Sequence, residues 1–222
     1  MTGAGYLGYY SLESYDVQAC ANYCNSTSTC LSFNIFYERD PTLFPAAACP
    51  NPTAGTAIKC TLWGVPSSKA AASNFGQYRD QFQVVIAGSN AYNLVSPIAA
   101  SIPSFTAADV LAGTVNNVAA FIGSEYYNQP YNPAVCSAVC LATNAQNQAA
   151  AKAAGLSTYT ACNYFNSFVL SQNGAATGMY CNFYSAVSSN SATSSGTSSN
   201  GVSFAYSNSL GYALSVIDPG HF

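Results

Sequence analysis

The sequence is poor in charged residues, which make up only 6% of its 222 residues. An ordinary soluble domain carries about 25%. Intrinsic disorder over most of the chain is excluded, because disorder requires low hydrophobicity and high net charge, whereas 50% of these residues are hydrophobic. The net charge of −3 offers no basic surface, so we expect no nucleic-acid partner.

Long apolar runs are missing as well. The most apolar long stretch, residues 96–123, is interrupted by Pro97, Pro103 and Asp109, and no run reaches the ~20 apolar residues that a membrane-spanning helix needs. We therefore expect no membrane span. Low charge promotes association, so the sequence leaves two possibilities open: attached sugars cover the surface, or the protein assembles with other copies.

Histidine is nearly absent, since His221 is the single one and lies next to the last residue. Nucleophilic catalysis by Ser or Cys normally needs a neighbouring base, most often His. Glu38 and Asp40 could form a carboxylate pair for glycoside hydrolysis. However, Arg39 between them and the turn-forming Asp40-Pro41 favour a loop held by ion pairs. We expect neither enzyme activity nor a cofactor.

Nine cysteines are abundant for a chain of this length, and this density is typical of secreted proteins stabilised by disulfides. Zinc is the rival interpretation, but the close pairs are spaced C-x3-C and only one histidine accompanies them, so we expect no metal. The odd number leaves at least one cysteine free or bonded to another molecule. No signal peptide is visible, and we expect the chain to be a mature or trimmed part of a longer secreted precursor.

The two halves of the sequence repeat one pattern. It consists of C-x3-C, then C-x-x-F-N, then C-x-[LF]-[WY]. Residues 20–24, 30–34 and 60–63 match residues 136–140, 162–166 and 181–184, and upstream residues 6–8 match 121–123. Several matches in the same order are not expected by chance, so the chain is a tandem duplication.

Each repeat carries signals for one helix and several strands. Asp16, and Asn132 followed by Pro133, are N-cap residues for a short helix, and cysteines four apart lie on one helical face. Aromatic and β-branched segments predict strands at residues 31–37, 58–63, 82–87, 159–170, 178–184 and 202–206. The sequence thus predicts an α+β fold with two modules, residues 1–95 and 115–222, joined by an apolar, Pro-containing connector, residues 96–114.

This pattern resembles the PAN/apple module, and more closely the fungal secreted proteins that carry two such modules in tandem. The residues that carry the resemblance are 15–20, 33–41, 49–52, 58–64 and 76–90. It covers nearly the whole chain. The resemblance implies extracellular modules, each a small antiparallel sheet with one helix, that bind protein or carbohydrate and have no catalytic apparatus.

The resemblance also implies a disulfide pairing, whereas spacing alone leaves three pairings open for each set of four cysteines. The implied pairs are Cys20–Cys60, Cys24–Cys30, Cys136–Cys181 and Cys140–Cys162. Cys49 has no counterpart in the second half. We expect it to be unpaired or bonded to another molecule, although a partner for it is expected in this family.

Two regions are candidates for glycosylation. Asn25 begins the only N-glycosylation sequon, Asn25-Ser26-Thr27, in a turn expected just past the first helix. Residues 185–200 form a Ser/Thr-rich, low-complexity stretch, read either as a flexible loop or, as we favour, as an O-glycosylated surface. The candidate acceptors there are Ser188, Ser189, Ser191, Thr193, Ser194, Ser195, Thr197, Ser198 and Ser199.

Composition favours binding or assembly over catalysis. Seventeen tyrosines with many Asn and Ser resemble the composition of binding surfaces, although a packed, hydroxyl-lined surface explains them equally well. In the doublets Tyr9-Tyr10 and Tyr126-Tyr127 we expect one ring to be buried and one exposed. Low charge, uncovered sheet edges and Cys49 favour self-association into an oligomer or filament.

We therefore expect a non-catalytic, extracellular structural or adhesive glycoprotein. It would self-associate at a cell wall or in an extracellular fibre, and its glycans would be attached covalently or bound as ligands. The alternative is a monomeric, secreted carbohydrate-binding module.

Overall fold

The computed structural model describes residues 5–95, 99–188, 192–193 and 195–222. The chain divides into two compact units, Met1–Leu94 and Val95–Phe222. Both are built on antiparallel sheets, and each carries one α-helix.

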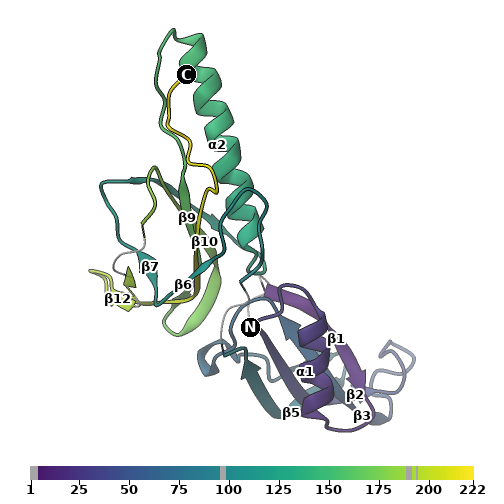
Figure 1. The fold of residues 1–222 in the computed structure, drawn as a ribbon. Helices are drawn as coiled ribbons and strands as arrows, with labels where there is room; N and C mark the ends of the chain where they lie inside the picture. The colour runs from purple at the N-terminus through teal and green to yellow at the C-terminus, as the bar shows by residue number, and fades with distance from the viewer. Residues whose placement is uncertain (1–4, 96–98, 189–191, 194) are drawn as a thin grey trace. The chain divides into compact units, whose positions relative to one another are not determined.

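The first unit is a five-stranded antiparallel sheet with strand order β1-β3-β2-β5-β4. Its strands are β1 (Tyr6–Leu12), β2 (Ser32–Pro41), β3 (Ala54–Trp63), β4 (Gly76–Arg79) and β5 (Phe82–Asn93). Helix α1 (Val17–Ser26) lies across one face of this sheet (Figure 1). The helix begins after Asp16, whose carboxylate accepts a 3.0 Å hydrogen bond from the Ala19 N–H, as the N-cap signal predicts.

The two faces of the first sheet differ because side chains alternate along each strand. Phe33 and Ile35 of β2 pack with Leu62 of β3 against α1. The disulfide Cys20–Cys60 joins α1 to β3, and Cys24–Cys30 joins it to the residues before β2. Within the described residues of the first unit, α1 is the only α-helix, and the short 3-10 helix η2 (Lys69–Ala71) lies beside the opposite face.

The second unit contains a sheet with strand order β12-β13-β9-β10-β8, in which β6 also pairs with β13. The elements are β6 (Asp109–Leu111), β8 (Phe121–Tyr127), α2 (Pro133–Ala153), β9 (Tyr164–Gln172), β10 (Ala175–Tyr184), β12 (Ser195–Thr197) and β13 (Ser203–Ala213). Two short strands, β7 (Thr114–Val115) and β11 (Ala192–Thr193), pair separately. Asn132 caps α2 by accepting a hydrogen bond from the Ala134 N–H at 3.1 Å.

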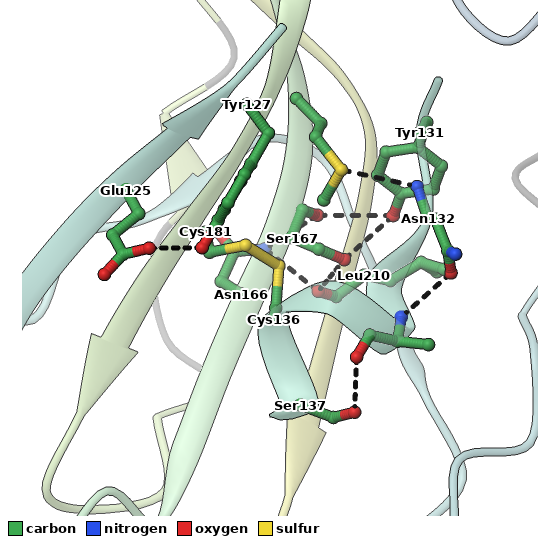
Figure 2. Close-up of a disulfide and its surroundings, with 12 residues drawn as sticks. Glu125, Tyr127, Tyr131, Asn132, Cys136, Ser137, Asn166, Ser167, Cys181 and Leu210 are labelled. Atoms are coloured by element: carbon green, nitrogen blue, oxygen red, sulfur yellow. Dashed lines mark hydrogen bonds between the residues drawn. A yellow bond between two sulfur atoms is a disulfide. The ribbon is translucent and has the colours of Figure 1, made fainter. Parts of the chain in front are cut away.

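Two disulfides fix α2 to its sheet. Cys136–Cys181 joins the first turn of the helix to β10, and Cys140–Cys162 joins the next turn to the residues before β9. Figure 2 shows the first of these beside Tyr131, whose hydroxyl shares a 2.9 Å hydrogen bond with the hydroxyl of Ser167 on β9. The start of α2 is therefore tied to two strands at once.

The α+β class predicted from the sequence, with its two PAN/apple-like modules, is wrong. Antiparallel strands dominate the described residues, which contain only two α-helices, and the fold is closer to all-β. Two strands are longer than predicted: β5 continues to Asn93 and β13 continues to Ala213. Residues with positive φ, Gly88 (59°) and Asn208 (50°), lie where the register shifts, so the strands continue through a bulge.

The helix prediction also needs a correction in the second unit. The cap at Asn132 predicted a short helix, but α2 has 21 residues. Residues 141–153 are rich in Ala and Gln, which favour helix, so the helix extends well beyond its second cysteine.

Residues 99–114 belong to the second unit in the structure, although residues 96–114 are predicted as a connector. Ile102 and Phe105 are buried, and β6 pairs with β13. Residues 96–98 of that prediction lie outside the described residues. The apolar side chains of this stretch are thus used for packing.

Candidate functional site

The face of the first sheet opposite α1 forms a groove of about 640 Å³. Small-ligand sites typically measure about 300–1,000 Å³. Strands β1, β2, β3 and β5 supply the floor, and residues between β3 and β4 supply part of the wall. Aromatic side chains line it together with neutral polar groups and a charged cluster.

Aromatic rings lie over β1 and β3. Tyr6 and Trp63 meet edge to face with their ring centroids 5.3 Å apart, and the Lys59 ammonium lies 5.4 Å from the centroid of Tyr9. Tyr6 and Tyr9 keep 45% and 54% of their surface exposed. The Trp63 indole N–H donates to the Thr61 hydroxyl at 3.2 Å.

The sequence predicts that each tyrosine doublet contains one buried and one exposed ring, and the structure contradicts this prediction. Tyr10 is 41% exposed although its neighbour Tyr9 is exposed too. The reason is that Tyr10 stacks on Tyr23 of α1, with ring centroids 3.9 Å apart. This contact lies at the margin of the sheet, where a packed ring keeps one side in water.

A network of ion pairs lies in the groove around Lys59. Its ammonium group donates to Glu38 and lies 2.8 Å from a carboxylate oxygen of Asp40. Arg79 lies 3.6 Å from the same carboxylate.

The network moves three pKa values. Burial raises the pKa of Glu38, and the hydrogen bond from Lys59 offsets this only in part. Burial acts in the same direction on Asp40, but hydrogen bonds from Lys59 and Glu38 prevail and its pKa is lowered. Burial acts to lower the pKa of Lys59, yet the bonds to both carboxylates raise it.

Arg39 is not the partner of these carboxylates, contrary to the sequence prediction. It donates to the backbone carbonyl of Gln83, and its guanidinium lies 4.2 Å from the centroid of the Phe82 ring. The predicted loop is part of β2, which continues to Pro41. Because alternate residues of a strand face opposite sides, Glu38 and Asp40 share the groove face and Arg39 faces the other side.

Asn34 and Ser89 form a polar pair on the groove floor. The Asn34 amide nitrogen donates to the Ser89 hydroxyl at 3.0 Å and to the Asn90 carbonyl at 2.9 Å. The Asn34 side-chain oxygen receives a 3.4 Å hydrogen bond from Ser89. Both side chains remain partly open to solvent.

The second unit repeats this pair at equivalent positions. The Asn166 amide nitrogen donates to the Ser209 hydroxyl at 2.8 Å and to the Leu210 carbonyl at 3.1 Å. Asn166 lies opposite Asn182 in the sheet, as Asn34 lies opposite Thr61. We call Asn34 with Ser89, and Asn166 with Ser209, the Asn–Ser clamp of each unit.

In the second unit the clamp is occupied by the chain itself. Residues 112–120, which follow the edge strand β6 and which we call the covering segment, lie over this face. The Val115 N–H donates to the side-chain oxygen of Asn166 at 3.0 Å, and the Ser209 hydroxyl donates to the Gly113 carbonyl at 2.7 Å. The Tyr184 hydroxyl donates to the Val115 carbonyl at 2.7 Å.

The covering segment also fills the space above the second sheet. Val115 and Ala120 are buried in one cluster with Tyr164 and Tyr184. Two smaller hollows remain beside the segment, of about 300 and 260 Å³. Of two equivalent sheet faces, the second is covered and the first is open.

The structure contains four disulfides, and they are the pairs that the resemblance implies. Cys49 is half-buried and free, in a turn where its N–H donates to the Ala46 carbonyl at 2.8 Å. This disulfide content fits a secreted or extracellular protein.

The glycosylation candidates have different surroundings. Asn25 is exposed in the last turn of α1, whereas the sequence predicts a turn after the helix. Ser188 is buried, with 6% exposed, so its hydroxyl is inaccessible in the folded chain. Ser189, Ser191 and Ser194 lie outside the described residues. The exposed candidates are Thr193, Ser195, Thr197 and Ser199, and Ser198 is half-buried.

His221 lies in a bridge with Thr158, which ties the end of the chain to the residues after α2. Within the described residues, no three His, Cys, Asp or Glu side chains gather where they could hold a metal ion. In the same part of the chain, neither helix combines the length and apolarity needed to cross a bilayer.

Sequence reasoning missed the groove, although its key residues lie inside the repeated motifs. Asn34 ends C-x-x-F-N and Trp63 ends C-x-[LF]-[WY], where the second repeat has Asn166 and Tyr184. A shared polar Asn on a predicted strand was the available signal. Comparison with family models, curated proteins and solved structures finds no match to this chain.

Proposed function

We propose that the chain is a non-catalytic, extracellular adhesive or structural protein that binds its ligand in the groove of the first unit. One observation carries the proposal: the duplicated sheet face is filled by the covering segment in the second unit and is open in the first. Apolar clefts with a few convergent polar groups are the usual form of binding sites. The adhesive role would be exercised at a cell wall or in an extracellular assembly.

Carbohydrate is a second candidate ligand, and the combination of aromatic rings and amide groups in the groove is the observation that supports it. Tyr6, Tyr9 and Trp63 place aromatic rings beside the amides of Asn34 and Asn90. Rigid aromatic rings combined with adaptable polar groups are characteristic of binding surfaces.

Self-association is favoured by apolar side chains on the surface of the first unit. Phe44 is 87% exposed and Leu43 is 65% exposed, in the same loop as Cys49. Size-exclusion chromatography over a range of concentrations tests this role. We expect larger species that diminish with Phe44→Ser, and a covalent fraction that disappears with Cys49→Ser; a monomer at every concentration would contradict it.

The groove is tested by filling it. Ala91 is exposed and lines the groove, so Ala91→Arg should block it, while Ala145→Arg makes the same change on the exposed surface of α2. Both variants are applied to an array of cell-wall polysaccharides and extracellular matrix proteins. We expect Ala145→Arg to bind as the original protein does and Ala91→Arg to lose binding; equal binding by both variants would show that the groove is not the ligand site.

A further inference from the structure

We propose that the groove binds an extended, uncharged polypeptide segment of a partner protein, held by its backbone as the second unit holds its own covering segment. This inference rests on the proposed function and names the ligand of the same site. The partner is recognised through peptide groups, so a segment with small or β-branched side chains resembling residues 111–118 fits the site.

The clamp of the second unit shows how the backbone is held. Asn166 accepts from the N–H of Val115, and Ser209 donates to the carbonyl of Gly113. In an extended strand, backbone groups two residues apart point to the same side. Asn166 and Ser209 therefore bind two peptide groups on the same side of one strand, and Tyr184 adds a third hydrogen bond at the Val115 carbonyl.

The first unit presents the same acceptor and donor, and among its described residues no covering segment is hydrogen-bonded to them. Asn34 is oriented by the same two hydrogen bonds from its amide nitrogen as Asn166. Among the described residues, its side-chain oxygen receives only the 3.4 Å bond from Ser89, which is weak compared with a usual hydroxyl bond of about 2.8 Å. A bound N–H and carbonyl would replace this contact with two stronger ones.

The position of Tyr184 is taken by Trp63, which also carries a donor. Its indole N–H donates to Thr61 at 3.2 Å, inside the groove. The ring meets Tyr6 edge to face, so these two rings do not form the coplanar platform on which a sugar ring would stack. The clamp and the rings together favour a peptide over a sugar.

The probe is a synthetic peptide with the sequence of residues 111–120, added to the full chain. Trp63 is the only tryptophan, so its fluorescence reports on the groove. We expect a saturable change in emission. N-methylation at the Val115 position of the peptide removes the N–H that Asn34 would accept and should weaken binding roughly tenfold, whereas N-methylation at the Asn116 position, on the other side of the strand, should not.

Variants of the protein test the same contact from the other side. Ser89→Ala removes the donor from an exposed position and should weaken peptide binding roughly tenfold. Ser157→Ala makes the same change at an exposed position outside both clamps and should leave binding unchanged. The absence of a saturable signal would overturn the proposal. So would a Ser89→Ala variant that binds the peptide as tightly as the original protein does, or a Val115-methylated peptide that binds as tightly as the unmodified one.

The two proposals fail in different ways. If Ala91→Arg abolishes binding to polysaccharides on the array and the peptide gives no signal, the groove binds carbohydrate and the peptide proposal is wrong. If Ala91→Arg changes nothing on the array, the groove itself is not the binding site.

Discussion

A Cβ atom at Gly211 would overlap the hydroxyl of Tyr164, so the absence of a side chain on β13 makes room for a ring on β9. Tyr164 is fully buried and packs with Val115 and Ala120 of the covering segment. In the first unit, Ala91 corresponds to Gly211, because Ala91 lies opposite Asn34 as Gly211 lies opposite Asn166. Ser32 corresponds to Tyr164. The first sheet therefore has no ring at this position of its floor.

This relationship predicts a coupled pair of substitutions. Gly211→Ala should destabilise the second unit by about 1–3 kcal/mol, the usual cost of overpacking. Tyr164→Phe should be nearly neutral, because the Tyr164 hydroxyl has no hydrogen-bond partner among the described residues. The double variant should recover part of the loss, since the ring then lacks the overlapping oxygen, although its Cζ atom would still lie 2.7 Å from the new Cβ.

Urea unfolding followed by circular dichroism measures all three free energies, and their double-mutant cycle gives the coupling. If the effects of the two substitutions on the free energy of unfolding were additive, Gly211 would not be required to make room for the Tyr164 hydroxyl.

The Lys59 network predicts a second effect on stability. Lys59→Met leaves Glu38 and Asp40 close together without their shared cation and should cost about 2 kcal/mol at neutral pH, the usual contribution of hydrogen bonds to charged groups. Trp63 fluorescence during urea unfolding measures the first unit. Lys69→Met is the matched control, since Lys69 is exposed and lines the same groove, and it should change little.

The pH dependence of this network follows from the two opposite carboxyl shifts. The pKa of Asp40 is lowered in the folded state. Asp40 therefore stabilises the fold at pH values above the pKa of an unfolded Asp, and this stabilisation is lost as the pH falls through the pKa of Asp40 in the folded state. The raised pKa of Glu38 acts in the opposite sense and favours the folded state as Glu38 protonates. In Lys59→Met both carboxyl groups lose the shared ammonium group, and Asp40 keeps only Arg79 at 3.6 Å. Acidification toward about pH 4 should therefore restore part of the lost stability.

The two disulfides of the first unit should contribute different amounts to the free energy of unfolding. Cys20–Cys60 closes a loop with a sequence separation of 40 and Cys24–Cys30 one of 6. The chain-entropy model gives about 4 and about 2 kcal/mol for such loops. Replacing both cysteines of a pair by Ala, and comparing unfolding by Trp63 fluorescence, tests this order. Cys49→Ala, which breaks no disulfide, serves as the control, and a larger loss from the short loop would contradict the model.

Local signals in the sequence predicted local structure. Asp16 and Asn132 each cap the helix that follows, because capping depends only on the next few residues. The register of β2 was not predicted. Whether Arg39 or Lys59 pairs with Asp40 depends on the strand continuing to Pro41, and a Pro there suggested a turn.

The groove could not be predicted because it depends on long-range covering. Asn34 and Asn166 each end a C-x-x-F-N motif, and their amide nitrogens make two corresponding hydrogen bonds within their sheets. Asn166 is covered because Val115, 51 residues away in sequence, donates a hydrogen bond to its side chain. A repeat comparison identifies equivalent residues, but it does not show which face a distant segment occupies.

Tyrosines whose pKa is raised in the folded state predict a loss of stability at alkaline pH. Burial raises the pKa of Tyr212 to about 12, although its hydrogen bond to the Ala100 carbonyl acts in the opposite direction. Burial and the bond to Glu125 raise the pKa of Tyr127 to about 12. An unfolded tyrosine ionises near 10, so these groups contribute stability that is complete below about pH 10 and is lost as the pH rises toward 12.

Phenolate absorbance during an alkaline titration measures this loss, and Tyr212→Phe isolates one residue. The variant keeps the ring that stacks on Phe165 at 5.0 Å and loses the 3.0 Å bond to Ala100, which should cost about 1 kcal/mol at neutral pH. Its alkaline decline should be shallower, because one group no longer ionises on unfolding. Tyr78→Phe, at an exposed position, should change neither the stability at neutral pH nor its decline at alkaline pH. An equal alkaline slope in Tyr212→Phe and the original protein would mean that Tyr212 does not contribute to the decline.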